Sequence, residues 1–322
     1  MRLSKCSKPG TKVTEHEQIA LEAVDGHDIH VQIWRPTQAP TQVIQILHGL
    51  GEHAERYSRF ADAATARGCI VYCHDHRGHG KHADQLGYFA AKDGWSLVVS
   101  DVDTVHGEIV DRHPDLPLTL LAHSMGSYIA QSYLIEHSPK ITSLLLSAST
   151  WPSRPLLLLA ATLAKIEGWR LGAHRNSALM QGLGFSDFNK PFRPSRTNSD
   201  WLSRDNSEVD AYIASPLCGG PFSAQLWSDL TAGLFGISSD AALRRIQSDL
   251  PILITGGELD PVGGDKGMGK LAIHYAQTGH NRLKVKIYPQ GRHEMLNDIV
   301  RDEVTQDWLD WILTTSRNAR SG

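Results

Sequence analysis

Short, nearly continuous apolar runs recur along the chain, and most are followed by a segment with helical spacing of apolar residues. Strands are predicted at residues 42–47, 69–73, 117–122, 141–147, 251–255 and 283–288. Helices are predicted at residues 56–66, 93–112, 126–136, 268–278 and 298–314. Ahead of these, residues 17–34 indicate two further strands joined by a turn at Asp25-Gly26. Apolar strands that alternate with helices predict an α/β protein with a mostly parallel eight-stranded sheet and helices on both faces.

The alternation stops between residues 149 and 243, where the chain has several Pro and Gly breaks, no convincing strand and many large apolar residues. This pattern predicts a helical cap, residues 149–243, inserted after the sixth strand. The core is then formed by residues 15–148 and 244–322, and residues 1–14 form a flexible tail.

One stretch of the predicted cap, "RPLLLLAATLAKIEGW" at residues 154–169, is apolar on nearly all sides, and its Pro155 suits a first helical position. It predicts a helix that packs within the cap or between copies of the chain. The alternative is a helix that lines an acyl-chain channel or contacts a membrane surface.

The run "LTLLAHSMGSYIAQSYL", residues 118–134, places Ser124 between a predicted strand and a predicted helix. A sharp strand-to-helix turn exposes such a side chain at the carboxyl edge of the sheet, where the helix N-terminus stabilises negative charge. The pattern differs from G-x-S-x-G only by Ala122 in place of the first glycine. Ser124 is therefore a candidate nucleophile, and a helix-capping serine is the alternative for this stretch alone.

A serine hydroxyl becomes a nucleophile only with a base beside it, and that base needs an acid to orient it. Asp260 follows the predicted strand 251–255, and His293 follows the predicted strand 283–288. Both come at the carboxyl edge that carries Ser124, in the order serine, acid, histidine. The rival acids and bases nearby in the sequence are Glu258, Asp265, His274 and His280.

A tetrahedral oxyanion also needs hydrogen-bond donors. The loop "ILHGLGEHAERY" follows the predicted strand 42–47, and its glycines allow the backbone to approach a reacting centre. The backbone N–H groups of Leu50 and Met125 are the natural donors, and an ordinary glycine turn is the alternative.

These motifs resemble those of the monoacylglycerol lipase/lysophospholipase group of α/β-hydrolases, also called serine-aminopeptidase-like hydrolases. The matching motifs are "HGLGEHAERY", "DHRGHG", "AHSMG", "GELDPV" and "RHEMLND". The resemblance covers residues 17–315. It implies an α/β-hydrolase fold, a triad of Ser124, Asp260 and His293, an oxyanion hole at Leu50 and Met125, and a cap over the site. The chain departs from the family pattern at Ala122, at His82, where a serine is common, and at Ser215, where an aspartate is common.

We predict a serine hydrolase that cleaves carboxylic esters, above all monoacylglycerols or lysophospholipids, through an acyl-enzyme on Ser124. The alternatives are an amidase, peptidase or short-chain esterase with the same triad, or a non-catalytic binding protein on a hydrolase fold. The residues expected to line the substrate pocket are His48, Gly49, His123, Leu156, Leu179, Trp201 and Trp227.

Composition adds limits on partners and surroundings. The 322 residues carry a net charge of −3, which gives no electrostatic footprint for nucleic acid. The four cysteines lack metal spacing, and no signal peptide or span of about 20 apolar residues occurs, so a cytoplasmic protein with reduced thiols is expected. His74, His76, His79 and His82 suggest a metal site, but no Cys or Glu completes a ligand set nearby. Neither a metal nor another cofactor is expected.

Overall fold

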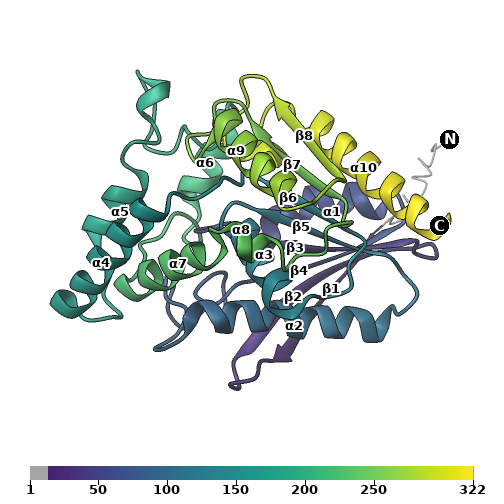
Figure 1. Ribbon diagram of the computed structural model, residues 1–322, viewed down its shortest axis with the longest axis horizontal. Helices are drawn as coiled ribbons and strands as arrows, with labels where there is room; N and C mark the ends of the chain where they lie inside the picture. The colour runs from purple at the N-terminus through teal and green to yellow at the C-terminus, as the bar shows by residue number, and fades with distance from the viewer. Residues whose placement is uncertain (1–13, 322) are drawn as a thin grey trace, which may run out of the picture.

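The computed structural model describes residues 14–321, which form one eight-stranded sheet in the order β1-β2-β4-β3-β5-β6-β7-β8 (Figure 1). The strands are β1 (Thr14–Glu22), β2 (Asp28–Pro36), β3 (Gln42–Leu47), β4 (Cys69–His74), β5 (Leu118–His123), β6 (Ser143–Ser147), β7 (Ile252–Gly257) and β8 (Leu283–Tyr288). The pairs β1–β2 and β2–β4 are antiparallel, and all the other pairs are parallel. The predicted fold, a mostly parallel eight-stranded sheet, is confirmed.

The central strands are buried on both faces, which explains why they are apolar runs without alternation. In β3, Val43 and Leu47 point to one core, whereas Ile44 and Ile46 point to the other. The first core is closed by helices α2 (Gly94–Arg112), α3 (Met125–His137) and α9 (Gly264–Gln277). The second is closed by α1 (Ser58–Thr65), which follows the short helix η1 (Ala54–Tyr57), and by α10 (Arg301–Ser321), which follows η3 (Met295–Asn297).

A helical insertion follows the sixth strand, as predicted, and lies on the left in Figure 1. Its elements are α4 (Arg154–Leu171), α5 (Ala178–Phe185), η2 (Lys190–Phe192), α6 (Asn206–Ala214), α7 (Ala224–Ile237) and α8 (Asp240–Leu243). Helix α7 packs against α2 and α3 of the core, and α4 packs on the outside of α7. A Cβ at Gly233 of α7 would lie 2.0 Å from the Trp95 ring, so glycine at this position allows the helix to approach the core.

Helix α4 is the stretch whose apolar surface had two interpretations. Only Ala164 and Glu167 are buried in it, whereas Trp169 is 90% exposed. Leu156, Leu158, Leu159 and Ile166 of the same helix are also exposed. Contact of this surface with another copy or with a membrane stays a prediction. Within residues 14–321, no helix is long and apolar enough to cross a bilayer.

The predicted elements match the structure except at a few ends. The start of α9 was placed too late, because its first six residues contain three glycines, which weaken the helical signal. A Cβ at Gly267 would lie 2.3 Å from Thr150 Oγ1, so this glycine is required by close packing of the helix. The predicted tail lies outside the described residues except for Thr14, which begins β1.

Candidate active site

Ser124 occupies a strained turn between β5 and α3. Its φ and ψ are 51° and −119°, a conformation that non-glycine residues rarely adopt. The Ser124 N–H donates to the Ser147 carbonyl of β6 at 2.9 Å, so the neighbouring strand fixes the turn from one side. Backbone strain of this kind persists only where contacts with the surrounding structure hold the residue in place, and it is common at functional sites.

The two positions that flank the serine motif have different requirements. A Cβ at Gly126 would lie 2.2 Å from the Leu47 carbonyl oxygen, so only glycine fits there. Ala122 belongs to β5, is fully buried and is not among the residues with positive φ. Its methyl group therefore introduces no backbone strain, which explains how this chain dispenses with the first glycine.

Asp260 and His293 lie together at the ends of β7 and β8, and both are buried. The His293 Nδ1 and Asp260 Oδ1 atoms are 2.9 Å apart. Burial alone would lower the pKa of His293, but the charge and hydrogen bond of Asp260 outweigh it and raise the pKa above 6.5. With Nδ1 bound to the carboxylate, Nε2 is the nitrogen that can accept a proton.

The rival residues lie in other surroundings. Glu258 accepts a hydrogen bond from the Gln290 N–H, and Asp265 accepts one from the Lys266 N–H. His274 pairs with Asp240 at 2.7 Å, and His280 bonds to residues at the end of α9. None of these four residues lines the cavity that contains Ser124.

The loop between β3 and η1 is held by hydrogen bonds to its backbone. The Gly49 N–H donates to Glu52 Oε1 at 2.6 Å, the Gly51 N–H to His79 Nε2 at 3.1 Å, and the Ala54 N–H to Asp75 Oδ1 at 2.7 Å. Within residues 14–321, the N–H groups of Leu50 and Met125 donate to no protein acceptor. The two predicted oxyanion donors are thus left available, while their neighbours are bonded.

The histidine-rich stretch 74–79 acts as part of this support. Burial lowers the pKa of His79 to about 4, so its Nε2 is an uncharged acceptor for the loop. His48 lies behind the loop, where its Nε2 accepts from the His76 N–H at 3.0 Å and its Nδ1 donates to the Gly49 carbonyl. Among the described residues, no group of three or more His, Cys, Asp or Glu side chains could hold a metal ion.

An ionic network lies beside the base. Arg56 forms two hydrogen bonds with Glu294, at 2.6 and 2.7 Å, and one with Glu52 at 3.1 Å. Glu52 also accepts from the Tyr57 hydroxyl at 2.9 Å. The network therefore joins the loop that carries Leu50 to the residue that follows His293.

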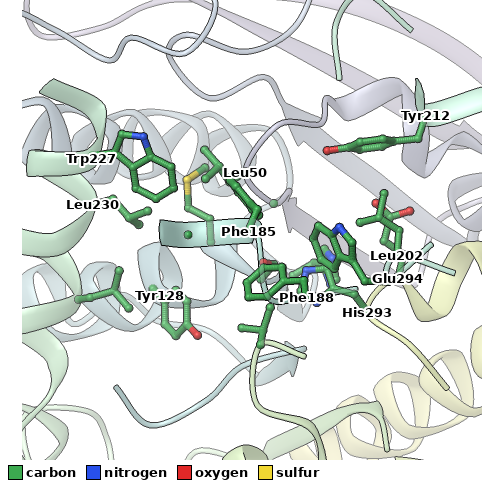
Figure 2. Close-up of a pocket in the computed structure, with 18 residues that line it drawn as sticks. Leu50, Tyr128, Phe185, Phe188, Leu202, Tyr212, Trp227, Leu230, His293 and Glu294 are labelled. Atoms are coloured by element: carbon green, nitrogen blue, oxygen red, sulfur yellow. The ribbon is translucent and has the colours of Figure 1, made fainter. Parts of the chain in front are cut away.

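A cavity of about 150 Å³ lies between the core and the insertion, and both Ser124 and His293 line it (Figure 2). Four of the predicted pocket residues line it: Gly49, His123, Trp201 and Trp227. Burial lowers the pKa of His123 to about 4, so this histidine is uncharged.

Three of the predicted pocket residues do not line this cavity. His48 is fully buried behind the loop, and Leu156 and Leu179 are 67% and 50% exposed to solvent. The two leucines were assigned by their apolar character alone, which does not reveal which side of a helix faces a cavity.

Several lining residues were not predicted as part of the pocket. They are Tyr128, Gly184, Phe185, Phe188, Leu202, Tyr212, Leu230, Leu234, Val262 and Glu294. In Figure 2, Trp227 and Leu230 lie on one side of the cavity, and Tyr212 and Glu294 lie on the side of His293. The cavity is therefore mostly apolar and has a polar end next to the candidate base.

The sheet, the strained serine turn and the acid–histidine pair define the chain as an α/β-hydrolase. Residues 38–299 match the family described as serine aminopeptidase, S33, and the chain belongs to this family. The monoacylglycerol lipase of Mycolicibacterium smegmatis is 27% identical over 299 residues, covering 90% of this chain and 95% of that protein. The monoglyceride lipase of Homo sapiens is 27% identical over 318 residues, covering 92% and 90%.

Solved structures show the same fold. A thermostable carboxyl esterase from Bacillus coagulans, in complex with glycerol, superposes with a TM-score of 0.86 at 25% identity, covering 95% of this chain and all of that one. A soluble variant of monoglyceride lipase from Saccharomyces cerevisiae gives a TM-score of 0.73 at 18% identity, with 96% and 97% covered. Together with the sequence relatives, these similarities identify the chain as a hydrolase of the lipase and esterase type.

Proposed function

We propose that the protein hydrolyses carboxylic esters of monoacyl lipids through an acyl-enzyme on Ser124. The observation that carries this proposal is that a histidine bonded to a buried aspartate lines the same cavity as a serine in a strained strand-to-helix turn. The relatives named as monoacylglycerol and monoglyceride lipases favour the same substrate class.

In the proposed reaction, His293 Nε2 accepts the Ser124 proton as the hydroxyl oxygen attacks the ester carbonyl. Asp260 holds the imidazole in the required tautomer and stabilises its charged form. The N–H groups of Leu50 and Met125 bind the oxyanion of the tetrahedral intermediate. The alcohol leaves with the proton from His293. His293 then takes a proton from water, which attacks the acyl carbonyl; the bond to Ser124 Oγ breaks, the carboxylic acid is released, and His293 returns the proton to Ser124.

The cavity favours an acyl group over a peptide. Its walls include aromatic and aliphatic side chains from α5 and α7, among them Phe185, Trp227 and Leu234. Apolar walls stabilise a hydrocarbon chain by removing it from water, at about 0.8 kcal/mol for each buried CH₂ group. An amidase or peptidase with the same triad remains the second candidate, because the matched family is described as an aminopeptidase family.

The test is ester turnover by the wild type and by Ser124→Ala. We expect the alanine variant to lose hydrolysis of p-nitrophenyl esters and labelling by a fluorophosphonate, while its melting temperature stays close to that of the wild type. Turnover at the wild-type rate by the alanine variant would show that Ser124 is not the nucleophile.

Two further comparisons separate the acid and the substrate. Asp260→Asn should lose most activity, whereas Glu258→Gln, the matched control in the same loop, should keep it. A series of esters from acetate to palmitate should show a preference for longer chains. A preference for acetate, or for amino-acid amides, would favour the alternatives.

A further inference from the structure

The candidate base is held by the insertion as well as by the core. The Asp200–Arg204 segment, an irregular stretch between η2 and α6, runs beside residues 292–298. The His293 N–H donates to the Trp201 carbonyl at 3.3 Å, and the Glu294 N–H donates to the Leu202 carbonyl at 2.8 Å. The backbone on which the imidazole stands is therefore bonded directly to the insertion.

Side chains of both the core loop and the insertion add further hydrogen bonds to this connection. The Arg292 guanidinium donates to the carbonyl oxygens of Asp200 and Ser203, at 2.5 and 2.8 Å. The Ser203 hydroxyl donates to the Asn297 carbonyl at 2.8 Å. These bonds lie on both sides of His293 in the sequence, so the whole loop is attached.

An ion pair between Arg204 and a buried carboxylate closes the far end of the segment. Asp298 is fully buried, and Arg204 donates to its carboxylate through Nε at 2.8 Å, through Nη2 at 2.5 Å and through the backbone N–H at 3.1 Å. Both guanidinium donors bind Oδ1 and the backbone N–H binds Oδ2, so Arg204 holds both carboxylate oxygens. Neither residue lines the cavity, so the pair contacts no bound substrate.

The Trp201 ring packs directly on the imidazole. The centroids of the Trp201 and His293 rings are 5.0 Å apart. Trp201 also meets Phe188 in an edge-to-face contact, with the ring centroids 4.8 Å apart, and both rings line the cavity. Trp201 is 8% exposed, so it has little freedom to move independently of its neighbours.

We propose that Trp201 and Arg204 are positioning residues for His293, and that the Asp200–Arg204 segment of the cap sets the placement of the base. Hydrolysis then requires the cap to be packed against the loop that carries His293, in addition to any role of the cap in binding the acyl chain. The inference rests on the proposed function, in which His293 is the general base.

The alternative is that Trp201 only forms part of the acyl wall. The two roles differ in how they depend on chain length. A wall residue affects substrates whose acyl chain reaches it, whereas a positioning residue affects the chemical step for every ester, including an acetate.

The experiment compares Trp201→Leu with Trp227→Leu on p-nitrophenyl acetate and p-nitrophenyl decanoate. Trp227 lines the cavity on the side away from His293, so it is a matched control for loss of an aromatic wall (Figure 2). We expect Trp201→Leu to lower kcat by about 10-fold to 100-fold on both esters, with KM for the acetate nearly unchanged, because small displacements of a catalytic group have effects of this size. Trp227→Leu should impair the decanoate more than the acetate, whereas Trp201→Leu should impair both alike, and Trp201→Phe should restore part of the lost kcat.

Arg204→Lys provides a second test away from the cavity, since it keeps the charge but loses the fork of donors. It should lower kcat for the acetate in the same way, whereas Asp210→Asn, which breaks the exposed Arg196–Asp210 pair, should leave it unchanged. Melting temperatures show whether each variant is folded.

Loss confined to the decanoate in Trp201→Leu, together with wild-type acetate turnover in folded Arg204→Lys, would overturn the inference and leave the proposed function intact. A wild-type protein that neither cleaves the two esters nor reacts with a fluorophosphonate would overturn both.

Discussion

Replacing Glu52 tests how the loop that carries Leu50 is held in place. Glu52 is 4% exposed, and its Oε1 is the acceptor for the Gly49 N–H, one residue before the candidate oxyanion donor. Glu52→Ala removes that acceptor and leaves Arg56 paired with Glu294 alone. Glu52→Gln removes the charge but keeps an oxygen that can accept from Gly49.

The expected loss of kcat follows from these contacts. Removing one oxyanion donor costs about 2.7–4 kcal/mol, or about 10²–10³ in kcat. If the loop depends on Glu52, displacement of the Leu50 N–H in Glu52→Ala should approach this loss. Glu52→Gln should lose no more than about tenfold, because its remaining bond to Gly49 keeps the donor in place. Both variants should be less stable, but by less than the about 3–5 kcal/mol that an unpaired buried charge costs, because Arg56 keeps its bonds to Glu294.

The assay is kcat and KM on p-nitrophenyl acetate at one pH, with the urea midpoint of each variant measured in the same buffer. Folded Glu52→Ala with kcat within about threefold of the wild type would refute the reasoning. Equal kcat values for the alanine and glutamine variants would do so as well, because the bond to Gly49 would then contribute nothing.

Two predictions concern pH. Burial, together with the charge of Asp93, raises the pKa of Asp229 from 3.8 to about 6. The Oδ2 atom of Asp229 has no hydrogen-bond partner among the described residues. Ionisation of Asp229 therefore destabilises the folded protein from about pH 4 upward, and the effect is complete above about pH 6. The raised pKa corresponds to about 3 kcal/mol at most, and we expect Asp229→Asn to raise the free energy of unfolding by about 1–2 kcal/mol at pH 8 and to have little effect near pH 3.5. Urea titrations at pH 8 and near pH 3.5 check this. Equal effects of the substitution at the two pH values would contradict it. Glu294 is one of the charges that hold the pKa of His293 above 6.5, after Asp260 and against the opposing effect of burial. Glu294→Gln should therefore move the acidic limb of the kcat/KM profile to lower pH, and a limb that stays in place or moves to higher pH would count against this.

The sheet was predictable because its strands carry their own signal. Runs such as "QVIQIL" and "PLTLLA" are buried on both faces, so their apolar character survives in the sequence without alternation. The positions of Ser124, Asp260 and His293 followed from the same strands, since each residue comes just after one. Local order along the chain was enough to bring these three elements to one edge.

The cavity wall was less predictable, because the insertion has no regular layers. Phe188 and Trp201 lie in irregular segments, where no helical period indicates which side faces inward. Glu294 follows His293 directly in the sequence, but its importance appears only when Arg56, 238 positions away, is seen to bond it. Contacts that join distant loops leave no pattern in either one.

The two-layered insertion has a consequence for how such a protein can diversify. The inner helix α7 is bound to the core through Gly233 and Trp95, while the outer helix α4 is joined mainly to α7. Substitutions on the exposed surface of α4 can therefore accumulate without changing the geometry of the active site. Related proteins in different surroundings can then differ in the surface of this outer helix while keeping the same catalytic site.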